Sequence, residues 1–110
     1  LYESRLKELD YLNIIQNSSY CYKSSRHLFQ VSVNDNDSKT REKVMDFLNS
    51  ENIFLGVHYI DNTSYKVYSN YSSDCPNVRY YSNRVLSLPL HLHLKNEDVE
   101  RVCTALGKVE

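Results

Sequence analysis

The sequence predicts an α+β domain, with a small antiparallel sheet of about three strands and helices packed mainly on one face. Three observations support this class. Helical patterns alternate with short extended patterns along the chain, no repeat or linker divides it, and 110 residues are enough to bury one core. Residues 1–110 are therefore expected to form a single domain.

The N-terminal segment 1–16 is predicted to be an amphipathic helix, because apolar residues such as Leu6 and Leu9 recur at helical spacing among charged residues. The helix begins without a capping residue. We interpret it as the cut end of a longer helix that joins two domains. Residues 17–19 would end the helix, and residues 20–22 are a candidate for a brief extended piece.

The next segments carry the first clear strand. Residues 27–33 alternate apolar with polar side chains toward their end, which is typical of a half-buried strand. Residues 34–37 have the composition of a turn. A helix capped by Asp37 or Ser38 should then run to about Ser50.

The centre of the chain carries the predicted strand on which the expected function depends. Asn52 is predicted to close the preceding helix in a left-handed conformation. The run 53–59 is apolar, β-branched and aromatic, and it is the predicted central strand. Residues 60–74 form a loop rich in tyrosine, without a clear period.

The last third of the chain completes the predicted sheet and its helical cover. Pro76 suits the first turn of a helix, and Tyr81 is expected on the inner face of that helix. Residues 85–88 form the third strand. Asn96 is the predicted cap of the last helix, and Gly107 is predicted to close it.

The composition excludes several classes of function. The formal charge of −1 gives no electrostatic reason to expect nucleic acid or a membrane, and the ten tyrosines lack the basic groove of a single-strand RNA binder. Three cysteines without CxxC spacing favour a reducing compartment, so we expect a cytoplasmic protein. With two glycines, the chain cannot build a glycine-rich loop for a nucleotide or cofactor phosphate.

Two histidine-containing motifs are candidates for a site. His58 and Tyr59 end the predicted central strand, where they could contact a substrate or be an ordinary strand-end pair. Successive side chains of a strand point to opposite faces, so at most one of the two would face a cleft unless the strand ends between them. His91 and His93 have a known metal-ligand spacing, but no third ligand is placed by the sequence, so no metal site is predicted.

Several short motifs follow one another in a characteristic order and spacing. They are His27-Leu28-Phe29-Gln30-Val31, Phe47-Leu48, Ile53 with Gly56-Val57-His58-Tyr59, Cys75-Pro76, Arg84-Val85-Leu86-Ser87-Leu88-Pro89-Leu90-His91, and Asp98-Val99-Glu100-Arg101-Val102. Together they resemble the small domain of the DegT-like sugar aminotransferases, which are pyridoxal-phosphate enzymes of aminotransferase fold type I, and the likeness covers about residues 26–106. The sequence departs from the family pattern at Asn52, where glycine is usual, and in the loop 60–65, where a proline is usual.

The resemblance implies that catalysis and substrate contact are divided between two domains of a longer protein. In that family the Schiff-base lysine and the phosphate cup lie in the large N-terminal domain, so this chain is expected to hold no catalytic and no cofactor-binding residue. It would supply substrate contacts through His58 and Tyr59, and the longer parent would be a homodimer that binds pyridoxal phosphate and a nucleotide-linked keto-sugar. These enzymes serve polysaccharide or deoxyamino-sugar biosynthesis. The alternative is a self-standing α+β module that binds a ligand or another protein.

Overall fold

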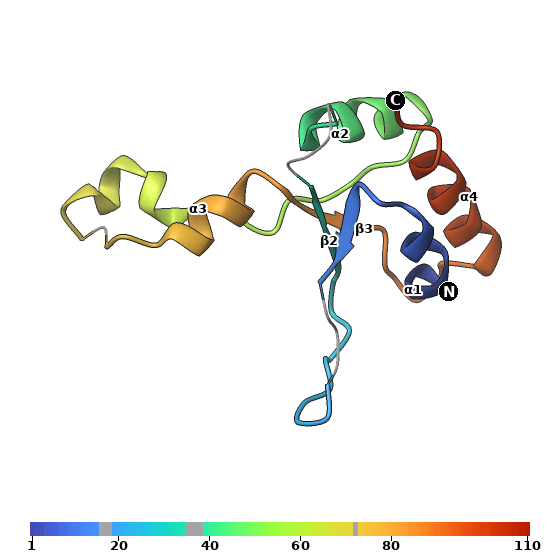
Figure 1. Cartoon of the computed structure of the whole chain (residues 1–110), viewed down its shortest axis with the longest axis horizontal. Helices are drawn as coiled ribbons and strands as arrows, with labels where there is room; N and C mark the ends of the chain where they lie inside the picture. Colours follow the sequence, from blue (N-terminus) through green and yellow to red (C-terminus); the bar gives the residue numbers. More distant parts are fainter. Residues whose placement is uncertain (16–18, 35–38, 72) are drawn as a thin grey trace.

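A three-stranded antiparallel sheet, in the order β1-β2-β3, lies at the centre of the computed structural model (Figure 1). The structure describes residues 1–15, 19–34, 39–71 and 73–110. The strands are β1 (Leu12–Ile14), β2 (Phe29–Val33) and β3 (Val85–Leu88). Leu12 pairs with Val33 and Phe29 pairs with Leu88, so β2 is the middle strand.

The described residues also form four α-helices and three short 3-10 helices. The α-helices are α1 (Tyr2–Arg5), α2 (Arg41–Ser50), α3 (Pro76–Ser82) and α4 (Asn96–Leu106). The 3-10 helices are η1 (Leu6–Glu8), η2 (Asn62–Ser64) and η3 (Lys66–Tyr71). Within the described residues, no helix has both the length and the apolar character needed to cross a bilayer.

The hydrophobic core lies between one face of the sheet and α1, α2 and α4. Phe29, Val31 and Val33 alternate along β2 and all belong to the core, which also takes Leu48 from α2 and Leu106 from α4. The alternation places Gln30 and Ser32 on the opposite face. The predicted α+β class, with three antiparallel strands and helices mainly on one face, is confirmed.

The predicted helix over 1–16 is wrong beyond its first turns. The α-helix ends at Arg5, the 3-10 turn ends at Glu8, and residues 12–14 form β1. The apolar spacing suits a helix, but Leu12 and Ile14 also alternate, and pairing with β2 satisfies their backbone groups. Tertiary pairing therefore overrides the helical pattern. The end predicted at 17–19 lies mostly on residues outside the described part.

Two other predicted extended pieces are also wrong. Residues 20–22 form the tip of a turn, in which the N–H of Ser19 donates to the carbonyl of Tyr22 at 2.9 Å. In the run 53–59, Gly56 alone makes a β-bridge, with Ser87 of β3. The carbonyl of His58 accepts instead from the Gln30 side chain, which ends the ladder after one pair. The segment lies beside the sheet without forming a strand.

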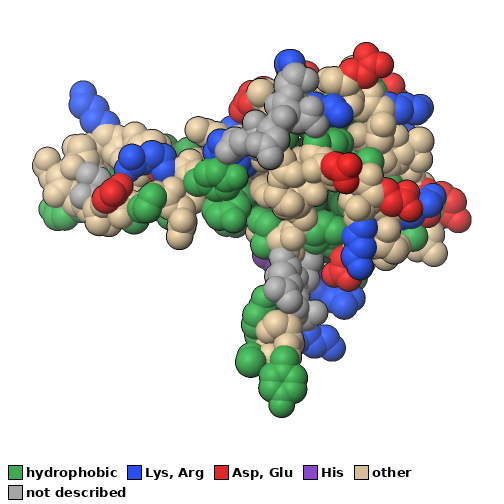
Figure 2. Space-filling model, in the orientation of Figure 1, with side chains coloured by type: hydrophobic (Ala, Val, Ile, Leu, Met, Phe, Trp, Pro, Cys, Tyr) green, Lys and Arg blue, Asp and Glu red, His purple; other side chains and the backbone are tan. Residues whose placement is uncertain are grey.

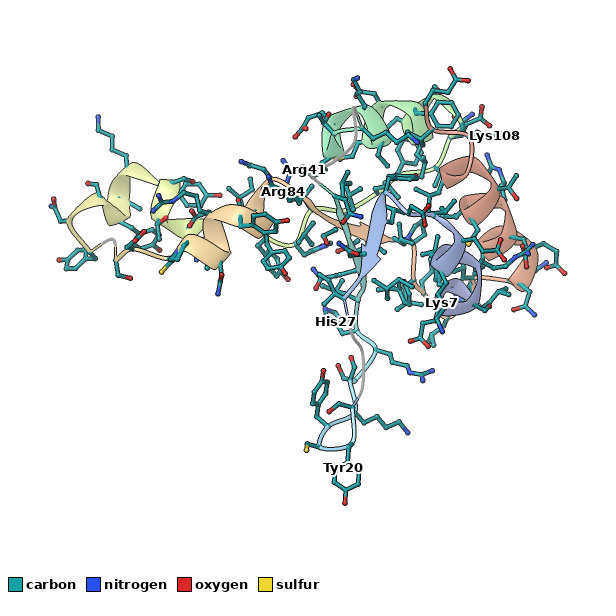
Figure 3. All side chains as sticks on the ribbon, viewed as in Figure 1. Lys7, Tyr20, His27, Arg41, Arg84 and Lys108 are labelled. Carbon is teal, nitrogen blue, oxygen red and sulfur yellow. The ribbon has the colours of Figure 1, made fainter. Side chains whose placement is uncertain are left out.

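Helix α3 does not bury the face that the sequence predicts. None of its residues is buried, and Val78 and Tyr81 are both about half exposed. The helix belongs to a segment, residues 59–82, that projects away from the sheet and is called the arm below (Figure 1). A second projection, the hairpin loop of residues 19–28, carries Tyr20 at its tip (Figure 3). Charged side chains lie over the helices around the sheet and on both projections, and hydrophobic side chains are also exposed on both projections (Figure 2).

The helix ends agree with the sequence in part. Asn52 has a φ of 57° after α2, so the predicted left-handed closure is confirmed. Gly107 closes α4 with an ordinary right-handed φ of −66°. The N-cap of α2 is Thr40, whose side chain accepts from the N–H of Lys43, while the predicted caps Asp37 and Ser38 lie outside the described residues.

The start of α4 is shifted by one residue from the prediction. Asn96 is the first residue of the helix, and Lys95 precedes it as the N-cap. The carboxylate of Asp98 accepts from the backbone N–H of Lys95 at 2.9 Å. A carboxylate in the first turn satisfies a free N–H and suits the positive end of the helix.

Two tyrosines tie the N-terminal segment to the core. The Tyr11 hydroxyl donates to the carbonyl of Leu106 at 2.7 Å, and the Tyr2 hydroxyl donates to the carbonyl of Pro89 at 3.0 Å. Burial raises the pKa of both phenols well above the usual range. Both side chains therefore serve as neutral hydrogen-bond donors at physiological pH.

Candidate functional site

A groove runs along the face of the sheet that the helical core leaves open. We call it the sheet groove, and its volume is about 580 Å³. It lies between β1 and β2 on one side and the end of α3 on the other. Its lining residues are Asn13, Ile14, Ile15, Gln30, Ser32, His58, Tyr80, Tyr81 and Val85.

His58 lines this groove and is held by two side chains of the sheet. Its Nδ1 lies 2.9 Å from the hydroxyl oxygen of Ser87, and its carbonyl accepts from Nε2 of Gln30 at 2.7 Å. Gly56 makes room for the ring, because a Cβ at that position would lie 2.5 Å from Cε1 of His58. The imidazole is therefore seated against β3, with its position set by three neighbours.

Tyr59 lies in different surroundings. Its side chain is 74% exposed, and its ring meets that of His58 edge to face, with the centroids 5.1 Å apart. It lines a separate shallow hollow along the arm, together with Val57, Asp61 and other neighbours. The peptide bond between His58 and Tyr59 is cis. The structure thus brings His58 to the groove and leaves Tyr59 outside it.

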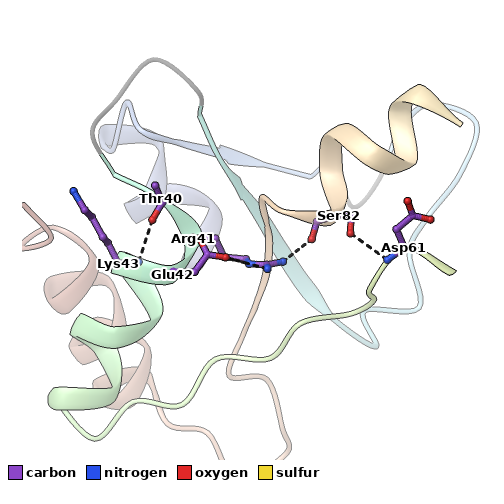
Figure 4. Close-up of polar contacts among 6 residues, drawn as sticks. All are labelled: Thr40, Arg41, Glu42, Lys43, Asp61 and Ser82. Carbon is purple, nitrogen blue, oxygen red and sulfur yellow. Dashed lines mark hydrogen bonds and ion pairs between the residues drawn. The ribbon is translucent and has the colours of Figure 1, made fainter. Parts of the chain in front are cut away.

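A polar network fixes the base of the arm (Figure 4). Nη1 of Arg41, at the start of α2, donates to the carbonyl of Ser82 at the end of α3. The Ser82 hydroxyl oxygen accepts from the backbone N–H of Asp61 at 3.1 Å. The carboxylate of Asp61 in turn accepts from the N–H and hydroxyl of Thr63 at 2.8 and 2.7 Å. These bonds join the first and last residues of the arm to each other and to α2, at the point where α3 ends.

Arg41 also makes an ion pair at this junction, with Glu42 at 3.1 Å. A hydrogen bond from the backbone N–H of Glu42, together with the Arg41 guanidinium, lowers the pKa of the Glu42 carboxyl. The carboxylate therefore stays ionised, and Arg41 keeps a charged partner at neutral pH.

Tyr80 and Tyr81 form the wall of the groove opposite the sheet. They are 45% and 46% exposed, and their rings meet edge to face with the centroids 5.1 Å apart. The Arg84 guanidinium lies over the Tyr80 ring at 4.1 Å. Neither tyrosine is predicted as a site residue from the sequence, because the apolar spacing predicts that the inner face of α3 packs against the core. Two adjacent tyrosines at a helix end are the only signal the sequence offers.

The described residues were also compared with the requirements of a metal site and of a pyridoxal-phosphate site. Across the described ranges, no group of three or more His, Cys, Asp or Glu side chains could hold a metal. The rings of His91 and His93 lie 6.5 Å apart, as a pair. The groove does not fit pyridoxal phosphate, since its lining has neither a lysine for a Schiff base nor a cation for the phosphate.

Comparisons with known proteins agree with this architecture. Residues 1–107 match the sequence model of the DegT/DnrJ/EryC1/StrS aminotransferase family. The aminotransferase TlmJ from Streptoalloteichus hindustanus superposes with a TM-score of 0.84 at 21% identity, over 96% of this chain and 28% of that chain. Helicobacter pylori PseC, an aminotransferase in the biosynthesis of pseudoaminic acid, gives a TM-score of 0.85 at 21% identity, over 98% and 29%.

The sugar aminotransferase CalS13 from Micromonospora echinospora is similar as well, with a TM-score of 0.82 at 17% identity, over 96% of this chain and 27% of that chain. At these identities the superpositions show a shared fold. The chain spans just over a quarter of the length of each of these proteins. Because the family model matches nearly its whole length, this chain belongs to the DegT/DnrJ/EryC1/StrS aminotransferase family.

Proposed function

We propose that this chain is the small domain of a pyridoxal-phosphate-dependent aminotransferase that acts on nucleotide-linked keto-sugars. In this proposal the sheet groove is one wall of the substrate cleft. The observation that carries it is the placement of His58, which is fixed by Ser87, Gln30 and Gly56 on the face that the helical core leaves open. Tyr59 would contact the substrate from outside the groove.

The catalytic groups would come from outside this chain. Transamination needs a lysine, an acidic partner for the pyridine nitrogen and a cup for the phosphate. The groove supplies none of these groups from its own lining. A large domain and a second subunit are the proposed partners, and the exposed hydrophobic side chains of the arm are available for such contacts. The match over residues 1–107 does not favour a self-standing module.

A first experiment compares the activity of this chain with that of the proposed full-length protein. We expect the chain to show no lysine-dependent visible absorbance and no turnover when pyridoxal phosphate and an amino donor are added. The full-length protein should transfer the amino group to UDP-, dTDP- or GDP-linked keto-hexoses. A lysine-dependent absorbance band with turnover in the 110-residue chain would contradict the proposal.

A second experiment addresses His58 in the full-length protein. The variant His58→Ala should raise KM for the sugar nucleotide about tenfold, the loss of one hydrogen-bonding contact, while cofactor absorbance stays unchanged. His93→Ala is the matched control, because His93 is exposed and does not line the groove. Wild-type kinetics in His58→Ala would remove His58 from the site.

A further inference from the structure

Among the residues that the structure describes, the lining of the sheet groove contains no Lys, Arg, Asp or Glu. Its nine residues are two amides, one serine, one histidine, two tyrosines and three aliphatic side chains. A diphosphate requires cations or a row of backbone N–H groups, and the lining offers no such cation. An aromatic wall facing amide groups instead suits an uncharged ring with hydrogen-bonding groups on its rim.

Two arginines beside residues of the groove wall bind other groups. Arg84 lies over the ring of Tyr80 and donates to the Tyr80 carbonyl. Arg41 donates to the Ser82 carbonyl and pairs with Glu42. Figure 3 shows both side chains at the junction of arm and body. They hold α3 in place, and the groove itself remains free of a fixed positive charge.

The amides on the opposite wall present oxygens. Gln30 uses its NH₂ group to bind the His58 carbonyl, and Asn13 uses its NH₂ group to bind Oδ1 of Asn34. For the described residues, the amide oxygens of Gln30 and Asn13 therefore remain as acceptors. Each NH₂ group also keeps a second N–H, so both amides can accept from and donate to the hydroxyl and N–H groups of a neutral ring, and neither supplies a charge for a phosphate.

We propose that the sheet groove binds an uncharged ring of the substrate, the hexose or the base, with Tyr81 as its stacking surface. The inference rests on the proposed function and states which part of the nucleotide sugar meets this domain. Tyr80 already carries the Arg84 guanidinium on its ring, so Tyr81 is the tyrosine assigned to the ligand. The diphosphate is bound by residues outside the groove.

The test uses the full-length protein and two variants of Tyr81. Tyr81→Leu removes the ring, and KM for the sugar nucleotide should rise about tenfold, the effect of one lost stacking contact. Tyr81→Phe keeps the ring and should stay within about twofold of wild type. KM for the amino donor and the cofactor absorbance should not change in either variant. Tyr71→Leu is the control, because Tyr71 is 85% exposed on the arm outside the groove.

Ionic strength distinguishes a neutral ring from a charged group. The rise in KM caused by Tyr81→Leu should be equal at about 50 mM and about 500 mM salt, because stacking is not screened. A rise that shrinks at high salt would overturn the inference. Inhibition by uridine and by methyl α-D-glucopyranoside tells base from hexose: Tyr81→Leu should weaken the inhibitor whose ring occupies the groove. If neither inhibitor weakens, the inference is overturned.

Failure of the groove assignment is distinguishable from failure of the proposed function. A full-length protein that transfers no amino group to any sugar nucleotide contradicts the proposed function. An active enzyme whose KM is unchanged in Tyr81→Leu contradicts the groove assignment alone. A fall in kcat with unchanged KM in both Tyr81 variants would show a structural role for the side chain, and it would also overturn the assignment.

Discussion

Replacing Leu86 by Ala is expected to lower the free energy of unfolding by about 3 kcal/mol. Leu86 is fully buried in β3, where it pairs with Val31 of the middle strand. Truncation removes apolar contacts and leaves a cavity between sheet and helices that close packing cannot fill. Urea unfolding followed by circular dichroism measures the change.

The matched control is Leu92→Ala, the same chemical change at a side chain that is 101% exposed. Its effect should stay within about 0.5 kcal/mol. Equal effects of the two substitutions would contradict the core described above.

The sequence predicted the segments in which local pattern and tertiary pairing agree. In β2 the apolar side chains alternate along the sequence and are buried in the core of the structure, so Phe29, Val31 and Val33 were correctly predicted to share one face. The strand within segment 1–16 could not be predicted, because Leu6, Leu9 and Leu12 also fit the spacing of a helix. Only pairing with β2 favours the strand over the helix, and β2 lies some twenty residues further along the chain.

The sequence singles out one residue that lines the sheet groove, His58, and does not single out Tyr80 or Tyr81. His58 lies two residues after Gly56 in a short apolar run, and the bridge from Gly56 to Ser87 brings it beside the sheet even though no strand forms. Tyr81 reaches the groove because Arg41 binds Ser82, a contact between residues far apart in the sequence. No local sequence pattern predicts such a long-range bond, so the wall of the groove that Tyr80 and Tyr81 form could not be predicted from the sequence.

Gly56→Ala should destabilise the chain by about 2 kcal/mol, the cost of overpacking a filled site. The new Cβ would lie 2.5 Å from Cε1 of His58, so the ring must move away from Ser87 and lose its hydrogen bond. The other glycine provides the control. At Gly107, which has a right-handed φ, an added Cβ would lie 3.5 Å from the carbonyl oxygen of Thr104, an ordinary contact distance, so Gly107→Ala should be neutral or stabilising by up to about 1 kcal/mol.

A double-mutant cycle isolates the contact between Gly56 and His58. In the His58→Ala background the clashing atom is gone, so Gly56→Ala should cost about 1 to 2 kcal/mol less than in the wild type. Chemical denaturation of the four proteins measures this coupling energy. A coupling near zero would show that Gly56 is needed for the backbone bridge to Ser87 and not for the ring. His58 would then owe its position to Ser87 and Gln30 alone.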